Sequence, residues 1–293
     1  MIKENTVVSK GRISYTQSIL HDFKKKYRGT LDNRIKTYQK IFRKAQFWYA
    51  DEDVVRLFIN TAVSAEAMHK VRLPHPAIVL EYTVPYLGGL TETQEEAPHR
   101  AVILQEEHDG ISIALLCHNP AINIWVPFPV MNISYDCIDD MNSWYKNTRG
   151  STEIGIDYSV FKFDPMYENI SKKNTQTILQ ETITDIQVIF AYLQLLNCSN
   201  INVSHVATDF KITRAARRRG KYAPSSFRHF NLNDNLRASY HSGINEDGSP
   251  RKVHWRRGHI RMQPTNHGVI KKWIHPTIVG TGIPEHQPVI MTT

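Results

Sequence analysis

The chain has 293 residues, of which 41% are hydrophobic and 22% are charged, and its formal net charge is +8. This composition excludes a disordered chain and predicts a globular protein with one large or two small domains. The first residues lack the apolar core of a signal peptide, and no run of about 20 apolar residues could span a bilayer, so we expect an intracellular protein without a membrane partner. Three scattered cysteines give neither a disulfide framework nor a metal-ligand spacing, which favours a reducing cytoplasm.

The positive charge is concentrated in the last third of the chain. From Lys211 onward there are 15 Lys and Arg residues against four acidic residues, a net +11, which leaves −3 for the first 210 residues. This asymmetry indicates a polyanionic partner, most often nucleic acid, with an anionic membrane surface or an acidic protein as weaker options.

The pattern of apolar residues predicts an α+β fold with amino-terminal helices, an antiparallel sheet, a long packed helix and a carboxy-terminal basic β-hairpin. Helical spacing is present over residues 14–29, 31–49, 53–71 and 171–197. Asp51 is a candidate N-cap for the third of these helices. Short β-branched or apolar runs occur at residues 77–82, 101–106, 111–117 and 122–128. The turn residues between them predict an antiparallel sheet with a hairpin at His108-Asp109-Gly110.

Three regions follow from these elements. Residues 1–208 are predicted to form a helical and β scaffold domain, which includes a strand at 201–205. Residues 209–250 are basic, interrupted by Gly and Pro, and are interpreted as a connector. Residues 251–293 are predicted to form a basic β-hairpin and tail rich in His and Trp.

The hairpin is predicted from two β-like runs, residues 253–263 and 269–279, which flank a loop from Pro264 to Gly268. Our interpretation pairs Arg261 with Lys271. Because side chains alternate along a strand, this register gives one cationic face and one apolar face. The cationic face would carry Arg257, His259, Arg261, Lys271, Trp273 and His275, and the apolar face Ile260, Met262, Ile270 and Ile274.

Clustered cations and two tryptophans predict RNA binding in this region. Several arginines close together neutralise several phosphates at once, and tryptophans among arginines can stack on bases. The candidate RNA-binding residues are Arg214, Arg217, Arg218, Arg219, Trp255, Arg256, Arg257, Arg261, Lys271, Lys272 and Trp273. The alternatives are a solubilising linker for the arginines and packing roles for the tryptophans.

Histidines suggest a catalytic alternative, because half of the 14 lie after residue 210. RNA cleavage without a metal needs a general base, a general acid and cations for the phosphorane charge. His259 and His275 are the candidates for acid and base, and the alternative is that they make ordinary contacts to phosphates or carbonyls. No cysteine accompanies these histidines, no spaced acidic cluster is present, and no nucleotide-binding glycine motif occurs, so we expect no metal and no cofactor.

The carboxy-terminal segment resembles a known family. The pattern Arg256-Arg257-Gly258-His259, a turn, Lys271-Lys272-Trp273-Ile274-His275-Pro276 and then Val279-Gly280 is similar to the end of phage and mobile-element proteins that include the second type V-A anti-CRISPR family. Other segments fall in a similar order: Gln46-Phe47-Trp48, Leu73-Pro74 to Tyr82, Val126-Pro127-Phe128, and Leu195-Leu196-Asn197-Cys198. The matching positions of the tail are Arg256, Arg257, Gly258, His259, Trp273 and Pro276.

The resemblance implies an unusual activity in the host cytoplasm. The anti-CRISPR member lowers production of the effector nuclease by recognising it during translation and provoking loss of its messenger RNA. We therefore expect a suppressor whose basic carboxy-terminal region binds messenger RNA or the translation machinery, while the scaffold could hold a nascent target polypeptide. A metal-independent ribonuclease and a protein-binding inhibitor without RNA are the alternatives. The sequence indicates neither the target nor the oligomeric state.

Overall fold

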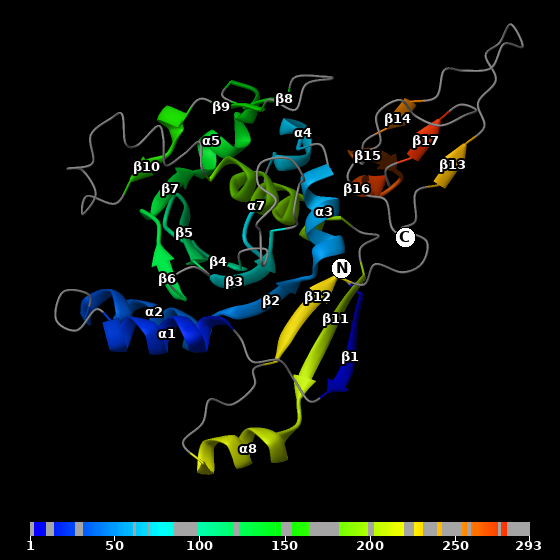
Figure 1. Cartoon of the computed structure of the whole chain (residues 1–293). Coiled ribbons are helices and arrows are strands. Elements are labelled where there is room, and N and C mark those ends of the chain that lie inside the picture. The colour runs from blue at the N-terminus through cyan, green and yellow to red at the C-terminus, as the bar shows by residue number, and fades with distance from the viewer. Residues whose placement is uncertain are drawn as a thin grey trace, which may run out of the picture.

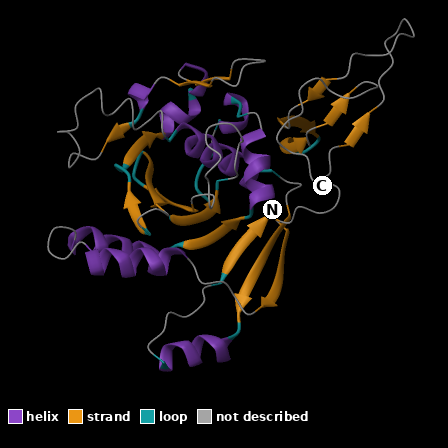
Figure 2. Ribbon diagram, viewed as in Figure 1, coloured by secondary structure: helices purple, strands orange, loops and turns teal. Residues whose placement is uncertain are grey.

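A mixed β-sheet of ten strands, curved around one buried helix, organises the part of the chain that the computed structural model describes (Figures 1 and 2). That part comprises residues 3–9, 15–26, 32–60, 63–69, 71–84, 99–119, 123–143, 145–147, 154–156, 158–163, 182–198, 202–219, 226–230, 239–241, 254–256, 259–274 and 277–279. Helices lie on both sides of the sheet, so the fold is α+β, as predicted.

The sheet combines an antiparallel half with a half that contains parallel pairs. Its strands are β1 (Lys3–Ser9), β2 (Gln46–Ala50), β3 (Ala77–Thr83), β4 (His99–Glu106), β5 (Gly110–Asn119), β6 (Ile124–Pro127), β7 (Met131–Ser134), β10 (Lys162–Phe163), β11 (Asn202–Thr208) and β12 (Phe227–Phe230). They lie in the order β1-β11-β12-β2-β3-β4-β5-β7-β10, and β6 also pairs with β5. The predicted antiparallel pairing of β3, β4, β5 and β6 is confirmed. The pairs β1 with β11, β12 with β2 and β2 with β3 are parallel.

Two layers of helices cover the sheet. The helices α1 (Tyr15–Lys26) and α2 (Asp32–Lys44) lie against its outer side, whereas α3 (Glu52–Asn60), α4 (Ala65–Met68), α5 (Tyr135–Asp139) and α7 (Ile183–Leu196) lie on the side toward which it curves (Figure 1). Central strands therefore have apolar residues on both faces rather than alternating ones. In β3, Leu80 packs into the core around α7, and its neighbour Val79 packs into the core under α1 and α2.

The helix α7 is apolar nearly all round because it is buried on nearly all sides. Its one buried carboxylate, Asp185, accepts a hydrogen bond from the hydroxyl of Tyr82 in β3. The Nε of Arg100 in β4 lies 3.5 Å from the same oxygen. These contacts join the first turn of α7 to two central strands. The predicted helix at 171–197 is thus confirmed from Ile183 to Leu196, while residues 171–181 lie outside the described residues.

One predicted helix is wrong at its carboxyl end. The second predicted helix ends at Lys44, and the aromatic residues Phe47 and Trp48 instead lie in β2, where Trp48 is buried in the main core. Aromatic residues favour a strand between two neighbours, and this tertiary environment overrides the helical spacing. Asp51, in contrast, caps α3 as predicted, because its Oδ1 accepts a hydrogen bond of 2.9 Å from the Val54 backbone N–H.

The remaining described elements are short or lie outside the main sheet. They are the 3₁₀ turns η1 (Met141–Ser143) and η2 (Tyr158–Val160), the strand pair β8 (Tyr145–Asn147) and β9 (Ile154–Ile156), the helix α8 (Phe210–Arg218), the hairpin β15 (His259–Thr265) and β16 (Gly268–Ile274), and a small sheet of β13 (Ser239–His241), β14 (His254–Arg256) and β17 (Thr277–Val279). No helix in the described residues has the length and apolar content needed to cross a membrane.

Candidate nucleic-acid interface

The basic segment after residue 208 is a helix followed by a strand of the main sheet, not a connector. Asp209 begins α8 as its N-cap, since its Oδ1 accepts a 2.7 Å hydrogen bond from the Lys211 backbone N–H. After the helix, β12 returns to the sheet between β11 and β2. The predicted boundary at residue 208 therefore does not separate a scaffold from a connector. In Figure 1, α8 lies at the far end of β11, away from the core around α7.

One face of α8 is cationic. A helix turns about 100° per residue, which places Lys211, Arg214 and Arg218 within an arc of about 60°. All three side chains are exposed, and so is that of Arg219 just beyond the helix. Arg214 and Arg218 are neighbours at i and i+4, a like-charge spacing that destabilises a helix by a few tenths of a kcal/mol. The side chain of Arg217 lies outside the described ones, although its backbone is helical.

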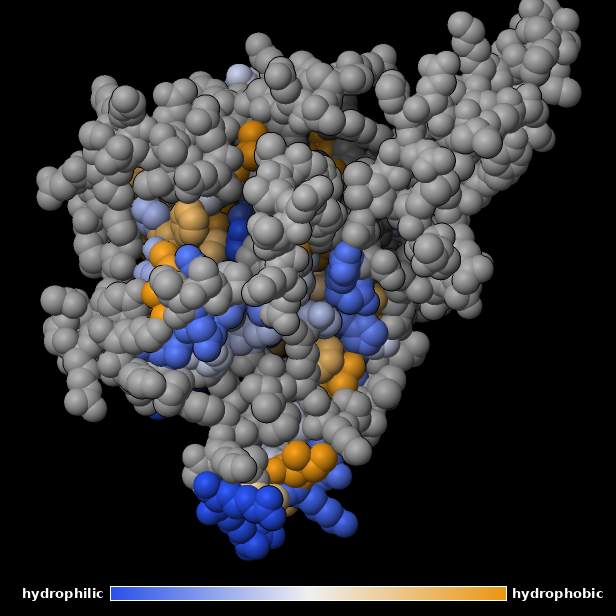
Figure 3. All heavy atoms as spheres, viewed as in Figure 1, coloured by the Kyte–Doolittle hydropathy of each residue, from blue (hydrophilic) through white to orange (hydrophobic). Residues whose placement is uncertain are grey.

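A large aromatic residue lies on the same face. Phe210, the first residue of α8, is 73% exposed, more than any other large hydrophobic residue described. By the same helical geometry, it lies about 40° around the helix from Arg214. The space-filling view shows hydrophobic surface directly beside hydrophilic surface at this tip of the molecule (Figure 3). Asp209 is the only acidic residue in the stretch from β11 through α8.

The hairpin has a different register from the predicted one. Arg261 pairs with Lys272, not Lys271, and Thr265 pairs with Gly268 around a two-residue turn. Gly268 has φ +112°, which suits glycine, and the Thr265 hydroxyl donates to the Gly268 carbonyl at 2.6 Å. Pairs alternate between hydrogen-bonded and non-hydrogen-bonded types outward from the turn. Pro264 therefore occupies a non-hydrogen-bonded position, where it needs no N–H. The strand β15 extends to Thr265, which lies inside the predicted loop.

This change of one residue reverses the faces of β16. Trp273 lies opposite Ile260 and is buried in the main core with 2% of its surface exposed, so its predicted place on the cationic face is wrong. A base could stack on Trp273 only if the hairpin left the core. The burial of an indole and an aliphatic side chain against the scaffold is the physical reason for this register.

Lys271 also points toward the scaffold. Its Nζ donates hydrogen bonds of 2.9 Å and 3.1 Å to the carbonyls of Ala67 and His69, at the end of α4. Burial lowers the pKa of Lys271, against the opposing effects of Cys198 and Asp139. A cation at the carboxyl end of a helix is favourable, so this lysine fixes the hairpin to α4 rather than contributing to an outer cationic face.

The outer face of the hairpin retains part of the predicted cationic surface. Arg261 is exposed and lies opposite Lys272, which is half-buried. His259 is half-buried and lies opposite Ile274. Trp255 and Arg256 lie in β14, which pairs with β17, and their side chains lie outside the described ones. Arg257 and His275 lie outside the described residues, so the pairing of His259 with His275 as acid and base stays a prediction.

The two cationic surfaces are separate. In Figure 1, α8 and the hairpin β15–β16 lie at different sides of the core around α7. The sequence places their residues in one basic region, but β12 runs between them and returns to the sheet. The helix surface is the stronger candidate because it combines three exposed cations with an exposed aromatic ring.

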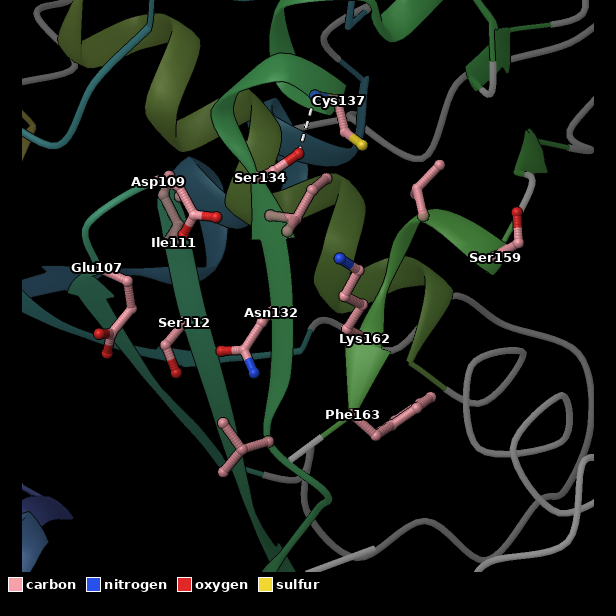
Figure 4. A pocket seen from close by; sticks show the side chains of 14 residues that line it. Glu107, Asp109, Ile111, Ser112, Asn132, Ser134, Cys137, Ser159, Lys162 and Phe163 are labelled. Atoms are coloured by element: carbon pink, nitrogen blue, oxygen red, sulfur yellow. Dashed lines mark hydrogen bonds between the residues drawn. The ribbon is translucent and has the colours of Figure 1, made fainter. Parts of the chain in front are cut away.

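A hollow of about 980 Å³ lies elsewhere, at the β7–β10 edge of the sheet (Figure 4). Ser112, Asn132 and Lys162 form a cross-strand row along it. Its floor requires Gly110, because a Cβ there would lie 2.2 Å from the Ile133 carbonyl oxygen. The carboxylates of Glu107 and Asp109 line the same hollow and would repel phosphates. This hollow therefore lies apart from the candidate interface on α8.

Sequence reasoning missed Phe210. The available signal was the order Thr208-Asp209-Phe210-Lys211, in which an N-cap residue precedes a run without Gly or Pro up to Arg219. Recognition of that helix start would have placed Phe210 on the same face as Arg214. No protein-family model, no curated protein and no solved structure matches this chain.

Proposed function

We propose that this chain is a suppressor that binds RNA through the cationic face of α8 and lowers the amount of a target messenger RNA. The single observation that carries RNA binding is the exposed face of Lys211, Arg214 and Arg218, with the exposed ring of Phe210 at its edge. Adjacent like charges cost the isolated helix stability, and phosphates of a bound strand offset that cost by neutralising them and releasing counterions.

The basic helix α2 differs from α8 in where its aromatic residues lie. The exposed residues of α2 include Lys36, Lys40 and Arg43. Its aromatic residues, however, turn inward: Tyr38 is buried and Phe42 packs against the core under α1 and α2. The surface of α2 is thus an ordinary solvated face, whereas α8 presents cations and an aromatic ring together.

The second half of the proposal, loss of a messenger, rests on the resemblance of the carboxy-terminal segment to the second type V-A anti-CRISPR family. In that scheme α8 holds messenger or ribosomal RNA while another surface recognises the nascent polypeptide. A ribonuclease in which His259 and His275 act together gains no support from the described contacts of the hairpin. An inhibitor that binds only protein does not need a cluster of exposed cations on one face of α8.

The test measures RNA affinity of the purified chain by fluorescence anisotropy. The variant Lys211→Gln/Arg214→Gln/Arg218→Gln removes three cations from α8. Its matched control, Lys36→Gln/Lys40→Gln/Arg43→Gln, removes three exposed cations from α2. The two variants therefore have the same net charge. We expect the α8 variant to lose at least tenfold in affinity and the α2 variant to stay within about twofold of wild type.

Two results would count against the proposal. Equal losses in both variants would mean that net charge, not α8, governs binding. Absence of RNA binding by the wild type would remove the proposal altogether. If binding is as expected, the steady-state level of a translated reporter messenger, measured in cells that express either variant, tests the second half.

A further inference from the structure

An exposed phenylalanine at the start of α8 has no structural explanation within the described fold. Phe210 is 73% exposed, while the buried phenylalanines of the described core, such as Phe23 and Phe58, are at most 4% exposed. Burial of a phenylalanine side chain is worth about 1.5–3 kcal/mol, so a ring left in water forgoes that stabilisation. Its backbone position does not require an aromatic residue either, because Asp209 supplies the cap.

We propose that Phe210 is a stacking platform for one unpaired base, and that α8 selects single-stranded RNA over duplex RNA. This inference rests on the proposed function and specifies the class of RNA. A base that stacks on Phe210 leaves a flanking phosphate beside Arg214, which lies one turn along the helix and about 40° around it from the ring. An aromatic ring interleaved with cations is the common arrangement of proteins that bind single strands with little sequence preference.

Duplex RNA cannot use this arrangement. Its bases are stacked on one another, and the deep, narrow major groove of an A-form helix does not admit side chains. The cations of α8 would still attract the duplex backbone, so duplex RNA should bind through charge alone. The ring therefore distinguishes the two classes of RNA, while the cations set the affinity that both share.

The substitutions separate stacking from simple apolar contact. Phe210→Leu keeps an apolar side chain but removes the π face, and Phe210→Trp keeps and enlarges it. Val269→Ala is the matched control, because Val269 is an exposed apolar residue, 59% exposed, at the tip of the hairpin and away from α8. Circular dichroism during heating confirms that each variant is folded like the wild type.

The measurement is anisotropy with a labelled, unstructured single-stranded RNA of about 12 nucleotides, and with a duplex of the same length. We expect Phe210→Ala and Phe210→Leu to weaken single-strand binding about tenfold, with Phe210→Trp and Val269→Ala near wild type. Binding of the duplex, and the salt dependence of single-strand binding, should be unchanged by Phe210→Leu.

Each other outcome overturns the inference in a recognisable way. If Phe210→Leu binds single strands like the wild type, or weakens the duplex equally, Phe210 does not stack on an unpaired base. If every Phe210 variant binds both RNAs like the wild type while Lys211→Gln/Arg214→Gln/Arg218→Gln binds them more weakly, the ring does not stack on RNA. RNA binding by α8 then stands, and the ring serves a protein contact. If the wild type binds neither RNA, the proposed function itself fails.

Discussion

Trp273 shows how one residue changes role when its neighbours are known. Among arginines and lysines in the sequence, it suggests a surface for bases, but it lies in the main core opposite Ile260. Its indole is among the largest fully buried side chains of the described residues. Its burial therefore stabilises the fold by attaching the hairpin to the scaffold.

The first prediction concerns this attachment. Trp273→Ala should lower the free energy of unfolding by about 3–5 kcal/mol, because it removes a buried aromatic side chain and leaves a cavity. Arg261→Ala, at an exposed position of the same hairpin, should change it by about 0.5 kcal/mol or less. Urea denaturation measures both. A loss of RNA affinity in Trp273→Ala without a loss of stability would show that the indole contacts RNA directly.

Asp185 gives a second prediction at the residue scale. Burial raises the pKa of this carboxyl, although the Arg100 guanidinium and the Tyr82 hydroxyl oppose the shift. The folded chain then binds this proton more tightly than the unfolded chain. The contribution of Asp185 to stability is therefore fully present below its ordinary pKa of about 3.9 and is lost as the pH rises through the folded pKa.

The measurement compares the wild type with Asp185→Asn by urea denaturation across a pH series. Because Asn is neutral throughout, the wild type should lose unfolding free energy relative to the variant as the pH rises above about 4. Asp140→Asn, at an exposed carboxyl, is the control for general acid effects. A difference between wild type and Asp185→Asn that stays constant, or that grows in favour of the wild type with pH, would contradict the prediction.

At the scale of elements, the hairpin register can be tested chemically. Directly opposite residues of a hydrogen-bonded pair have Cα atoms about 5.5 Å apart, within the range that a disulfide bridges. Arg261→Cys/Lys272→Cys should therefore form a disulfide under mild oxidation, whereas Arg261→Cys/Lys271→Cys should not, because those side chains leave opposite faces. Wild type treated in the same way controls for Cys137, which is half-buried. Efficient trapping of the second pair alone would contradict the observed register.

The elements that sequence predicted well are those whose signal is local. Asp51 caps α3 through its own side chain, and the antiparallel pairing of β3 to β6 follows from runs separated by turn residues. The elements it missed depend on distant partners. β2 is a strand because it fits between β12 and β3, and the hairpin register is set by burial of Trp273 and by hydrogen bonds from Lys271 to the end of α4.

The same distinction applies to the candidate site. The arginines of α8 were identified from sequence because charge density is a local property. Phe210 was missed, since its importance depends on being exposed, and exposure is decided by how β11 carries the helix away from the core. Parallel pairs such as β1 with β11, nearly 200 residues apart in the chain, have no local signature at all.

At the scale of the whole molecule, charge is separated along the fold. The cations of α8 lie at one end of the view in Figure 1, and α5 lies at the other. Exposed carboxylates gather near α5 and the β4–β5 turn, at Glu106, Glu107, Asp109, Asp136 and Asp140. A polyanion should therefore be attracted to the α8 end, and in the proposed function this attraction orients the chain on RNA before any short-range contact forms.

The salt dependence of RNA binding shows whether the cations of α8 contact phosphates. For single strands, the logarithm of the binding constant falls against the logarithm of the salt concentration by about 0.7 for each neutralised phosphate. If Lys211, Arg214 and Arg218 each contact one phosphate, their replacement by Gln should reduce the slope by about 2, while the matched α2 variant keeps the wild-type slope. Equal slopes for the wild type and the α8 variant would contradict the account, because they would show that RNA does not bind this face.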